Sequence, residues 1–276
     1  MKKKVFRKVF VYAVSFLIVG VVVSSVLAIK DAKEQAALEA NYTEVKPVMT
    51  EEEMEHLYDR HKENYEAESV SGNEEGGIYE GCPVDFAGMW EINKDVYAWI
   101  TIPGTIIDYP ILQHATDNTY YLNYNIDGSY GYPGCIYTEN LNSKDFMDNN
   151  TVIYGHNLRS GAMFTSLHKF KDADFFEENK KVYIYTPQRE YDYTIFAAYV
   201  YDDRHLLYSF DFADNEVYAN YLEDIQSMRS MNALFREDIT VTAEDKIITL
   251  VTCIGNQPSK RLLVQAVLEQ EEIEKE

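Results

Sequence analysis

The chain has 276 residues, of which 46 are acidic and 25 basic, giving a formal net charge of −21 at pH 7. Such an acidic chain is unsuited to phosphate backbones, so the composition argues against a nucleic-acid partner. Hydrophobic residues make up 46% of the chain, which is enough for a packed core and excludes global disorder. The three cysteines exclude a disulfide-dense scaffold, and none has the CxxC spacing of a structural zinc site.

The first 30 residues predict a single membrane-spanning helix. Basic side chains come first, at Lys2, Lys3, Lys4, Arg7 and Lys8. An apolar run follows over residues 9–29, and a helix needs about 20 such residues to cross a bilayer. By the positive-inside rule the N-terminus would be cytoplasmic and the rest of the chain extracellular. A cleavable signal peptide ending near Val26 and Ala28 is the alternative, although this run exceeds the usual apolar core of about 7–15 residues.

Composition divides the remaining chain into a spacer, a domain and a tail. Residues 31–81 are acidic and contain many helix formers, so they predict a partly helical extracellular spacer. Residues 82–268 contain the strand and turn patterns of a folded domain. Residues 269–276 form a short acidic tail.

Short strands dominate the pattern from residue 84 onwards. They are predicted over residues 98–102, 106–112, 151–154, 181–186, 191–201, 246–253 and 262–268. Met163, Leu167 and Phe170 recur at helical spacing, and a longer helix is predicted over residues 217–235. Pro110 inside the second strand predicts an edge or a bend there. Many short strands with few helices indicate a mainly β fold, closed or nearly closed into a barrel.

A candidate nucleophile ends one of these strands. Residues 247–253 read Ile-Ile-Thr-Leu-Val-Thr-Cys, and Arg261 begins the next predicted strand after a seven-residue loop. Strands joined in this way usually pair antiparallel, so Cys253 and Arg261 would face each other at one rim. A guanidinium beside a thiol favours the thiolate and can hydrogen-bond a developing oxyanion. The alternative is a structural cysteine next to a solvated arginine.

His156 is the candidate acid–base partner that a thiol nucleophile needs. It follows the strand predicted over residues 151–154, at a position suited to projecting an imidazole into a cleft. The other histidines of the domain are weaker candidates. His114 is less constrained at its strand end, His168 lies off the apolar stripe of its helix and is expected to be exposed, and His205 lies in a polar loop.

Several motifs in the same order resemble the sortases, the cysteine transpeptidases of Gram-positive cell surfaces. Residues 249–253 (Thr-Leu-Val-Thr-Cys) are similar to the TLxTC signature, with Arg261 at the place of the essential arginine. Residues 154–156 (Tyr-Gly-His) match the segment of the catalytic histidine. The similarity to class B members in particular lies in residues 99–105, 109–113, 117–122 and 161–164. The resemblance covers about residues 84–268, behind an N-terminal anchor.

The resemblance implies a mechanism. The Cys253 thiolate would attack a Thr–Gly carbonyl in the C-terminal sorting signal of an exported protein, and His156 would protonate the leaving amine. Arg261 would stabilise the oxyanion. A peptidoglycan amine would then resolve the thioacyl enzyme, so that no cofactor or metal is needed.

The resemblance also implies the fold, the groove and the partners. We expect a sortase-type closed barrel of about eight strands, with N-terminal helices and a helix before the last two strands, behind the single transmembrane helix. Asn118, Leu122 and Thr252 are expected to contact the signal, and residues 201–210 to form another groove wall. The partners would be surface proteins with NPQTN-like or (S/P)PxTG-like signals, a peptidoglycan amine and the membrane. Val251 and Ile254 stand where some relatives have polar contacts, so the motif stays open.

Two other functions fit part of the sequence. A secreted thiol protease would use the same Cys253 and His156, with water resolving the acyl enzyme. A membrane-tethered binding protein that has lost catalysis is less compatible, because both residues and the arginine are present. Cys82 and Cys135 are expected to be unpaired, non-catalytic thiols, with a disulfide between them as the alternative.

Overall fold

The computed structural model describes residues 77–227 and 233–269. The predicted anchor over residues 1–30, most of the spacer predicted over 31–81 and nearly all of the tail predicted over 269–276 lie outside the described residues. Within the described ranges, no helix is both long enough and apolar enough to span a membrane.

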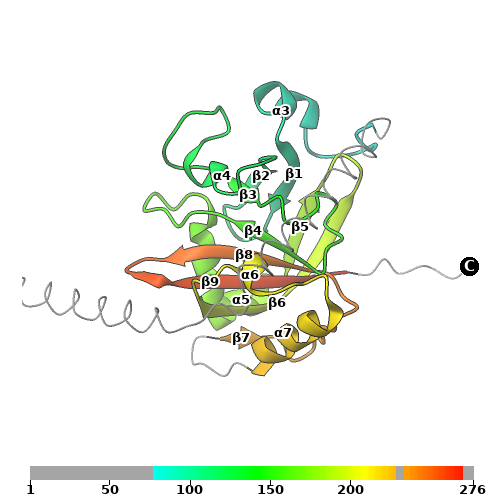
Figure 1. The fold of residues 1–276 in the computed structure, drawn as a ribbon, viewed down its shortest axis with the longest axis vertical. Coiled ribbons are helices and arrows are strands. Elements are labelled where there is room, and N and C mark those ends of the chain that lie inside the picture. The colour runs from blue at the N-terminus through cyan, green and yellow to red at the C-terminus, as the bar shows by residue number, and fades with distance from the viewer. Residues whose placement is uncertain (1–76, 228–232, 270–276) are drawn as a thin grey trace, which may run out of the picture. The chain divides into compact units, whose positions relative to one another are not determined.

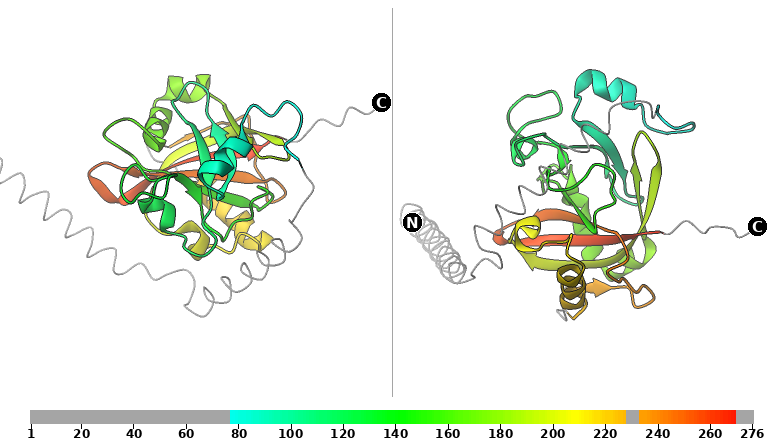
Figure 2. Two further views of the ribbon diagram at one scale, coloured as in Figure 1. Left: turned by 90° about the horizontal axis from the view of Figure 1, so that it is seen from above. Right: turned by 45° about the vertical axis from the view of Figure 1, so that its right-hand side comes forward.

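Eight strands close into a barrel (Figures 1 and 2). In ring order they are β5 (Lys181–Tyr185), β1 (Val96–Thr101), β2 (Asp108–Leu112), β3 (Ile136–Thr138), β4 (Asn150–Tyr154), β8 (Ile247–Ile254), β9 (Gln257–Leu268) and β6 (Glu190–Asp202). The β5–β6 pairing closes the ring. The β2–β3 and β4–β8 pairs are parallel, and the other pairs are antiparallel. The mainly β, closed-barrel prediction is confirmed.

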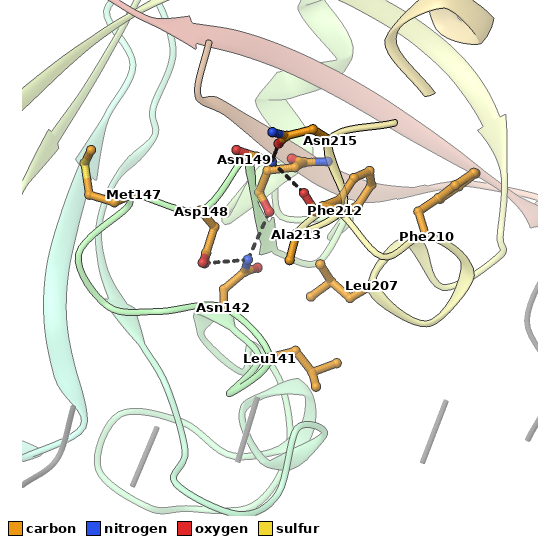
Figure 3. A pocket seen from close by; sticks show the side chains of 11 residues that line it. Leu141, Asn142, Met147, Asp148, Asn149, Leu207, Phe210, Phe212, Ala213 and Asn215 are labelled. Atoms are coloured by element: carbon orange, nitrogen blue, oxygen red, sulfur yellow. Dashed lines mark hydrogen bonds between the residues drawn. The ribbon is translucent and has the colours of Figure 1, made fainter. Parts of the chain in front are cut away.

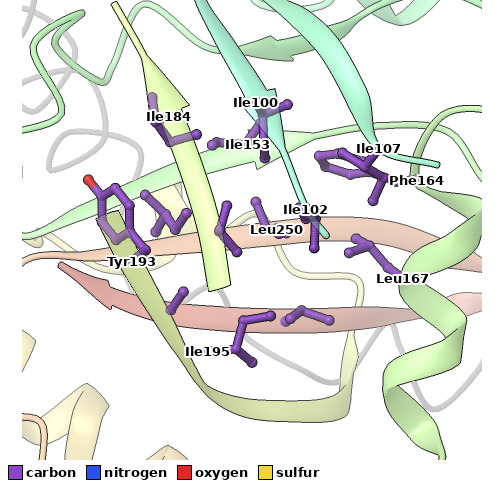
Figure 4. Close-up of a cluster of buried hydrophobic side chains, with 14 of the residues drawn as sticks. Ile100, Ile102, Ile107, Ile153, Phe164, Leu167, Ile184, Tyr193, Ile195 and Leu250 are labelled. Carbon is purple, nitrogen blue, oxygen red and sulfur yellow. The ribbon is translucent and has the colours of Figure 1, made fainter. Parts of the chain in front are cut away.

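Apolar side chains from alternate strand positions fill the barrel, because successive residues of a strand point to opposite faces. Figure 4 shows how they converge from around the ring, and the fully buried members include Ile100, Ile153, Ile184, Ile195 and Leu250. Phe164 and Leu167 of the 3-10 helix η1 (Phe164–Lys171) belong to the same cluster. Complete burial of one such side chain contributes about 1.5–3 kcal/mol, so this interior is the main source of stability.

Helices cover the outer face of β6, β8 and β9. In Figure 1, α7 (Asn215–Ser227) lies on one side of the β6–β9 pair, near the two-residue strand β7 (Leu234–Phe235). Its buried tyrosines, together with residues of α6 (Leu206–Ser209), pack against Val251 and Leu263. Both faces of β8 are therefore buried, which explains its unbroken run of apolar and small residues.

The predicted helix over residues 217–235 is wrong at its C-terminal end. Leu234–Phe235 instead form β7 and pair with Ala197 and Ala198 of β6. The Phe235 ring stacks on Tyr199 of β6, with centroids 5.8 Å apart, and this tertiary contact outweighs the helical periodicity.

Other elements also depart from the predictions. The helix predicted near Met163 is η1, and it is followed by a short unpredicted helix, α5 (Ala173–Glu178). Two further short helices are α3 (Phe86–Ile92) and α4 (Tyr120–Asn123). Pro110 does not lie in an edge strand, because β2 pairs on both sides; only Ile111 and Leu112 pair with β3, so the proline stands outside that ladder.

Candidate active site

The parallel pair β4–β8 brings His156 and Cys253 to the same rim. Tyr154, the last residue of β4, pairs with Val251 of β8. The Gly155 N–H donates to the Val251 carbonyl at 3.1 Å, and the Thr252 hydroxyl donates to the Gly155 carbonyl at 2.8 Å. His156 follows Gly155 and Cys253 follows Thr252, so His156 and Cys253 occupy adjacent positions at the ends of neighbouring strands.

The antiparallel pair β8–β9 brings Arg261 to the other side of Cys253, which is its direct partner in the register. The predicted seven-residue loop between them is wrong. β9 begins at Gln257, which pairs with Ile254, and the register shifts between the two pairs. The shift leaves residues 258–260 as an irregular stretch of β9, and the Arg261 Nη1 donates to the carbonyls of Pro258 and Lys260 at 2.7 and 3.0 Å.

The side chains of Cys253 and Arg261 belong to the outer face of the barrel. Val251 and Leu263 pack into the outer cluster under α6 and α7. Cys253 has the same strand parity as Val251, and Arg261 the same parity as Leu263, because side chains alternate with a period of two. Cys253 is exposed, although the six preceding residues of β8 are buried.

His156 is held by backbone and aromatic contacts. Its Nε2 lies 2.7 Å from the Leu122 carbonyl, and the Tyr132 ring meets the imidazole edge-on with centroids 5.2 Å apart. Gly155 before it has no room for a side chain, because a Cβ there would lie 2.5 Å from Ile136 and 2.6 Å from Phe164. A carbonyl only accepts hydrogen bonds, so this contact requires a proton on Nε2 and leaves Nδ1 as the basic nitrogen of a neutral ring.

Two side chains that the sequence analysis does not place in the site, Asn157 and His168, meet the carbonyl of Cys253. Asn157 donates its Nδ2 at 3.0 Å, and the Nε2 of His168 lies at 3.0 Å. His168 is half-buried, so the prediction of an exposed side chain is wrong. Asn157 directly follows His156 and could have been noticed, whereas no local signal links His168 to a residue 85 positions away.

The residues predicted to contact the substrate lie in different environments. Asn118 is half-buried and accepts the Asn140 N–H at 2.8 Å. Leu122 has an exposed side chain, and its carbonyl contacts His156. Thr252 is buried, and its hydroxyl is used within the β4–β8 junction.

Aromatic residues lie beside this rim on the outer face. Tyr137 of β3 stacks on Tyr154 of β4, with centroids 5.4 Å apart. Burial, followed by the nearby negative charge of Glu139, raises the pKa of both phenols, and Cys253 contributes to the rise of the Tyr137 pKa. The predicted wall over residues 201–210 includes α6, and His205 at its start lies with Nε2 2.8 Å from Glu139 Oε1. This contact ties α6 to the segment after β3.

A separate pocket lies away from this rim (Figure 3). It is lined by Asn142, Asn149 and Asn150 and by Leu207 and Phe210 of the segment opposite. Asn150 begins β4, whereas His156 follows the end of that strand, so the pocket belongs to the other end of the barrel.

The other thiols are engaged separately. Cys82 Sγ donates to the Val84 carbonyl and Cys135 Sγ to the Tyr124 carbonyl, at 3.6 and 3.4 Å. Burial, with the charge of Asp127, raises the pKa of the Cys135 thiol to about 12. Among the described residues, no three His, Cys, Asp or Glu side chains are grouped as metal ligands.

Comparison with known proteins agrees with this fold. A family model described as the sortase domain matches residues 100–269. Sortase B of Listeria monocytogenes is 31% identical over 197 residues, which cover 71% of this chain and 76% of the relative. Sortase B of Staphylococcus aureus is 29% identical over 66% of this chain and 73% of the relative. The crystal structure of sortase B from Bacillus anthracis in complex with AAEK1 has a TM-score of 0.60 and 33% identity, covering 77% of this chain and 99% of that one.

A thiol at the rim of a closed barrel, between a histidine and an arginine on neighbouring strands, fits a cysteine transpeptidase, and the family match covers more than half of the chain. The chain belongs to the sortase family. Within that family it is a class B sortase, so its substrates are proteins with a sorting signal and its acceptor is peptidoglycan.

Proposed function

We propose that Cys253 is the nucleophile, His156 the acid–base group and Arg261 the oxyanion-stabilising group of this sortase. The observation that carries the proposal is a single row at the rim, in which His156 follows the end of β4 on one side of Cys253 and Arg261 of β9 is its register partner on the other. A strand-borne row is rigid, and rigid placement is what acyl transfer requires.

In the first half-reaction the Cys253 sulfur attacks the carbonyl carbon of a Thr–Gly bond. The carbonyl oxygen takes the negative charge, and the planar guanidinium of Arg261 and a backbone N–H near the thiol stabilise it. Collapse of the tetrahedral intermediate breaks the C–N bond. His156 gives a proton to the departing glycine amine, and a thioester on Cys253 remains.

In the second half-reaction an amine of the cell wall attacks the thioester carbon. His156 takes the proton from that amine, and the Cys253 thiolate leaves. One amide is broken and one is formed, so the exchange needs no external energy source. Because Nε2 of His156 is committed to the Leu122 carbonyl, Nδ1 is the nitrogen assigned to both proton transfers.

The rest of the proposal concerns substrate and location. The signals would be NPQTN-like or (S/P)PxTG-like, bound along Asn118, Leu122 and Thr252. Residues 1–30 would anchor the enzyme with its N-terminus in the cytoplasm, and residues 31–81 would hold the catalytic domain (82–268) outside the cell, with an acidic tail over 269–276. The apolar run after a basic start supports this arrangement.

The test is a transpeptidation assay with the full chain in detergent. Sorting-signal peptides of both motif classes are incubated with an amine acceptor, and products are identified by mass spectrometry, with Cys253→Ala as the control. A transpeptidation product that requires Cys253 supports the proposal and identifies the motif. Product formation by Cys253→Ala would refute the nucleophile assignment, and cleavage without amine transfer would favour a hydrolase.

A further inference from the structure

The hydrogen-bond ladder between β4 and β8 ends just before the nucleophile. In a parallel pair, the carbonyl of one residue accepts from the N–H that follows its register partner. The Val251 carbonyl follows this pattern and accepts from Gly155. By the same pattern the Asn157 N–H would donate to the Cys253 carbonyl. Side chains fill this place instead, since Asn157 Nδ2 and His168 Nε2 both lie 3.0 Å from the Cys253 carbonyl oxygen.

This carbonyl belongs to the peptide bond that carries the Ile254 N–H. In a trans peptide the C=O and the N–H point in opposite directions. A carbonyl held on the β4 side therefore directs the Ile254 N–H towards the β9 side, where Arg261 is the register partner of Cys253. Ile254 pairs with Gln257, and the β8–β9 register shifts between this pair and the Cys253–Arg261 pair, so the peptide lies at the irregular point of the ladder.

His168 is well placed to act as a fixed donor. It lies in η1, whose residues Phe164, Leu167 and Phe170 are fully buried and anchor the helix. Burial lowers the pKa of His168, and the positive charge of Lys171 lowers it further, while the bond to the Cys253 carbonyl acts in the opposite direction. The imidazole is therefore neutral at neutral pH, with its proton on Nε2 where the carbonyl accepts it.

We propose that His168 and Asn157 are positioning residues for the acyl-transfer reaction, which together hold the Cys253 carbonyl and so set the orientation of the Cys253–Ile254 peptide beside the attacked carbonyl. They act on the oxyanion side of the reaction and take no part in proton transfer. This inference rests on the proposed role of Cys253 as the nucleophile.

The variants separate a hydrogen bond from bulk and from proton transfer. His168→Leu and Asn157→Leu remove the donors at similar size. His168→Gln keeps an N–H donor and removes the titratable ring. Lys169→Gln is the matched control, since Lys169 is the exposed neighbour on η1 and donates to the distant Gly104 carbonyl.

Two rates are measured on the full chain. The first is single-turnover formation of the thioacyl enzyme from a sorting-signal peptide that the wild-type enzyme accepts. The second is alkylation of the thiol by iodoacetamide, a reaction that develops no oxyanion. The melting temperature is recorded for each variant, and Cys253→Ala is assayed in parallel.

Each leucine variant should lower the acylation rate constant about tenfold to a hundredfold, with the alkylation rate and the peptide KM nearly unchanged. The double leucine variant should lose more than the product of the two single losses, because in each single variant the remaining donor still restrains the carbonyl in part. His168→Gln should stay within about threefold of wild type, as should the Lys169→Gln control.

Wild-type acylation in both leucine variants would overturn the inference. Parallel losses of acylation and alkylation would also overturn it, because the thiol itself would then be impaired. Failure of His168→Gln at a normal melting temperature would overturn the hydrogen-bond role. Transfer by Cys253→Ala would instead refute the proposed nucleophile, so the two failures are distinguishable.

Discussion

Replacement of Gly155 by alanine should impair both stability and catalysis. The added Cβ would lie 2.5 Å from the Ile136 Cδ1 and 2.6 and 2.7 Å from the Phe164 Cγ and Cδ2. Carbon atoms pack at about 3.5–4.0 Å, so the backbone or the Phe164 ring must move by about 1 Å. Overpacking of this kind costs about 1–3 kcal/mol. The next residue is His156, and a displacement of about 1 Å at a reacting group lowers the rate about a hundredfold.

Urea unfolding and transpeptidation kinetics measure the two effects. The unfolding free energy of Gly155→Ala should fall by about 1–3 kcal/mol, and kcat about a hundredfold. Gly255→Ala is the matched control, because it lies two residues from Cys253 and a Cβ there meets nothing within 4 Å. The reasoning is refuted if Gly155→Ala keeps wild-type stability and kcat, or if Gly255→Ala loses as much.

Four further outcomes are expected. Arg261→Lys should lower kcat/KM about a hundredfold or more, since an ammonium group cannot replace the planar guanidinium with its paired N–H donors. Near-normal kinetics for Arg261→Ala would contradict the oxyanion role. At about pH 8, iodoacetamide should modify the exposed Cys253 and spare the buried Cys135, whose pKa is raised to about 12; peptide mapping showing equal modification would contradict that burial. Burial lowers the pKa of His168, so the folded state binds this proton less tightly than the unfolded chain does, and the resulting stability, complete above about pH 6.5, is lost as the pH falls. His168→Gln should reduce that loss in urea titrations at about pH 7.5 and 5, and an identical pH dependence in the variant and the wild type would contradict this role of His168. Gln265→Leu should cost about 1–3 kcal/mol in unfolding free energy, because this fully buried amide bonds two tyrosine hydroxyls and a threonine hydroxyl, and an unchanged value would show that these hydroxyls find other partners.

Much of the barrel could be predicted because its information is local. The run over residues 247–253 alternates between the interior and the outer helices, and its facing strand is the next one in sequence. The prediction that Cys253 and Arg261 face each other therefore needed only a hairpin. The detail of that hairpin was missed, because the β9 strand starts at Gln257 and absorbs an irregular stretch that periodicity does not reveal.

The contacts that complete the site were beyond sequence reasoning because they are non-local. Periodicity indicates which face of a strand is buried, but not which strand lies beside it, so the β4–β8 pairing was not foreseen. The place of His168 on its helix, off the apolar stripe, predicts an exposed side chain. In the structure His168 contacts the end of β8, and no local sequence pattern identifies that partner.

The β4–β8 junction joins residues that are 97 positions apart, Gly155 and Thr252. Closing such a long loop costs conformational entropy before the contacts that it allows can stabilise the chain. A chain that has folded only as far as β6 therefore has its histidine but no nucleophile beside it. Enzymatic activity therefore requires the β4–β8 junction, which makes acyl transfer a reporter of the formation of this long-range contact.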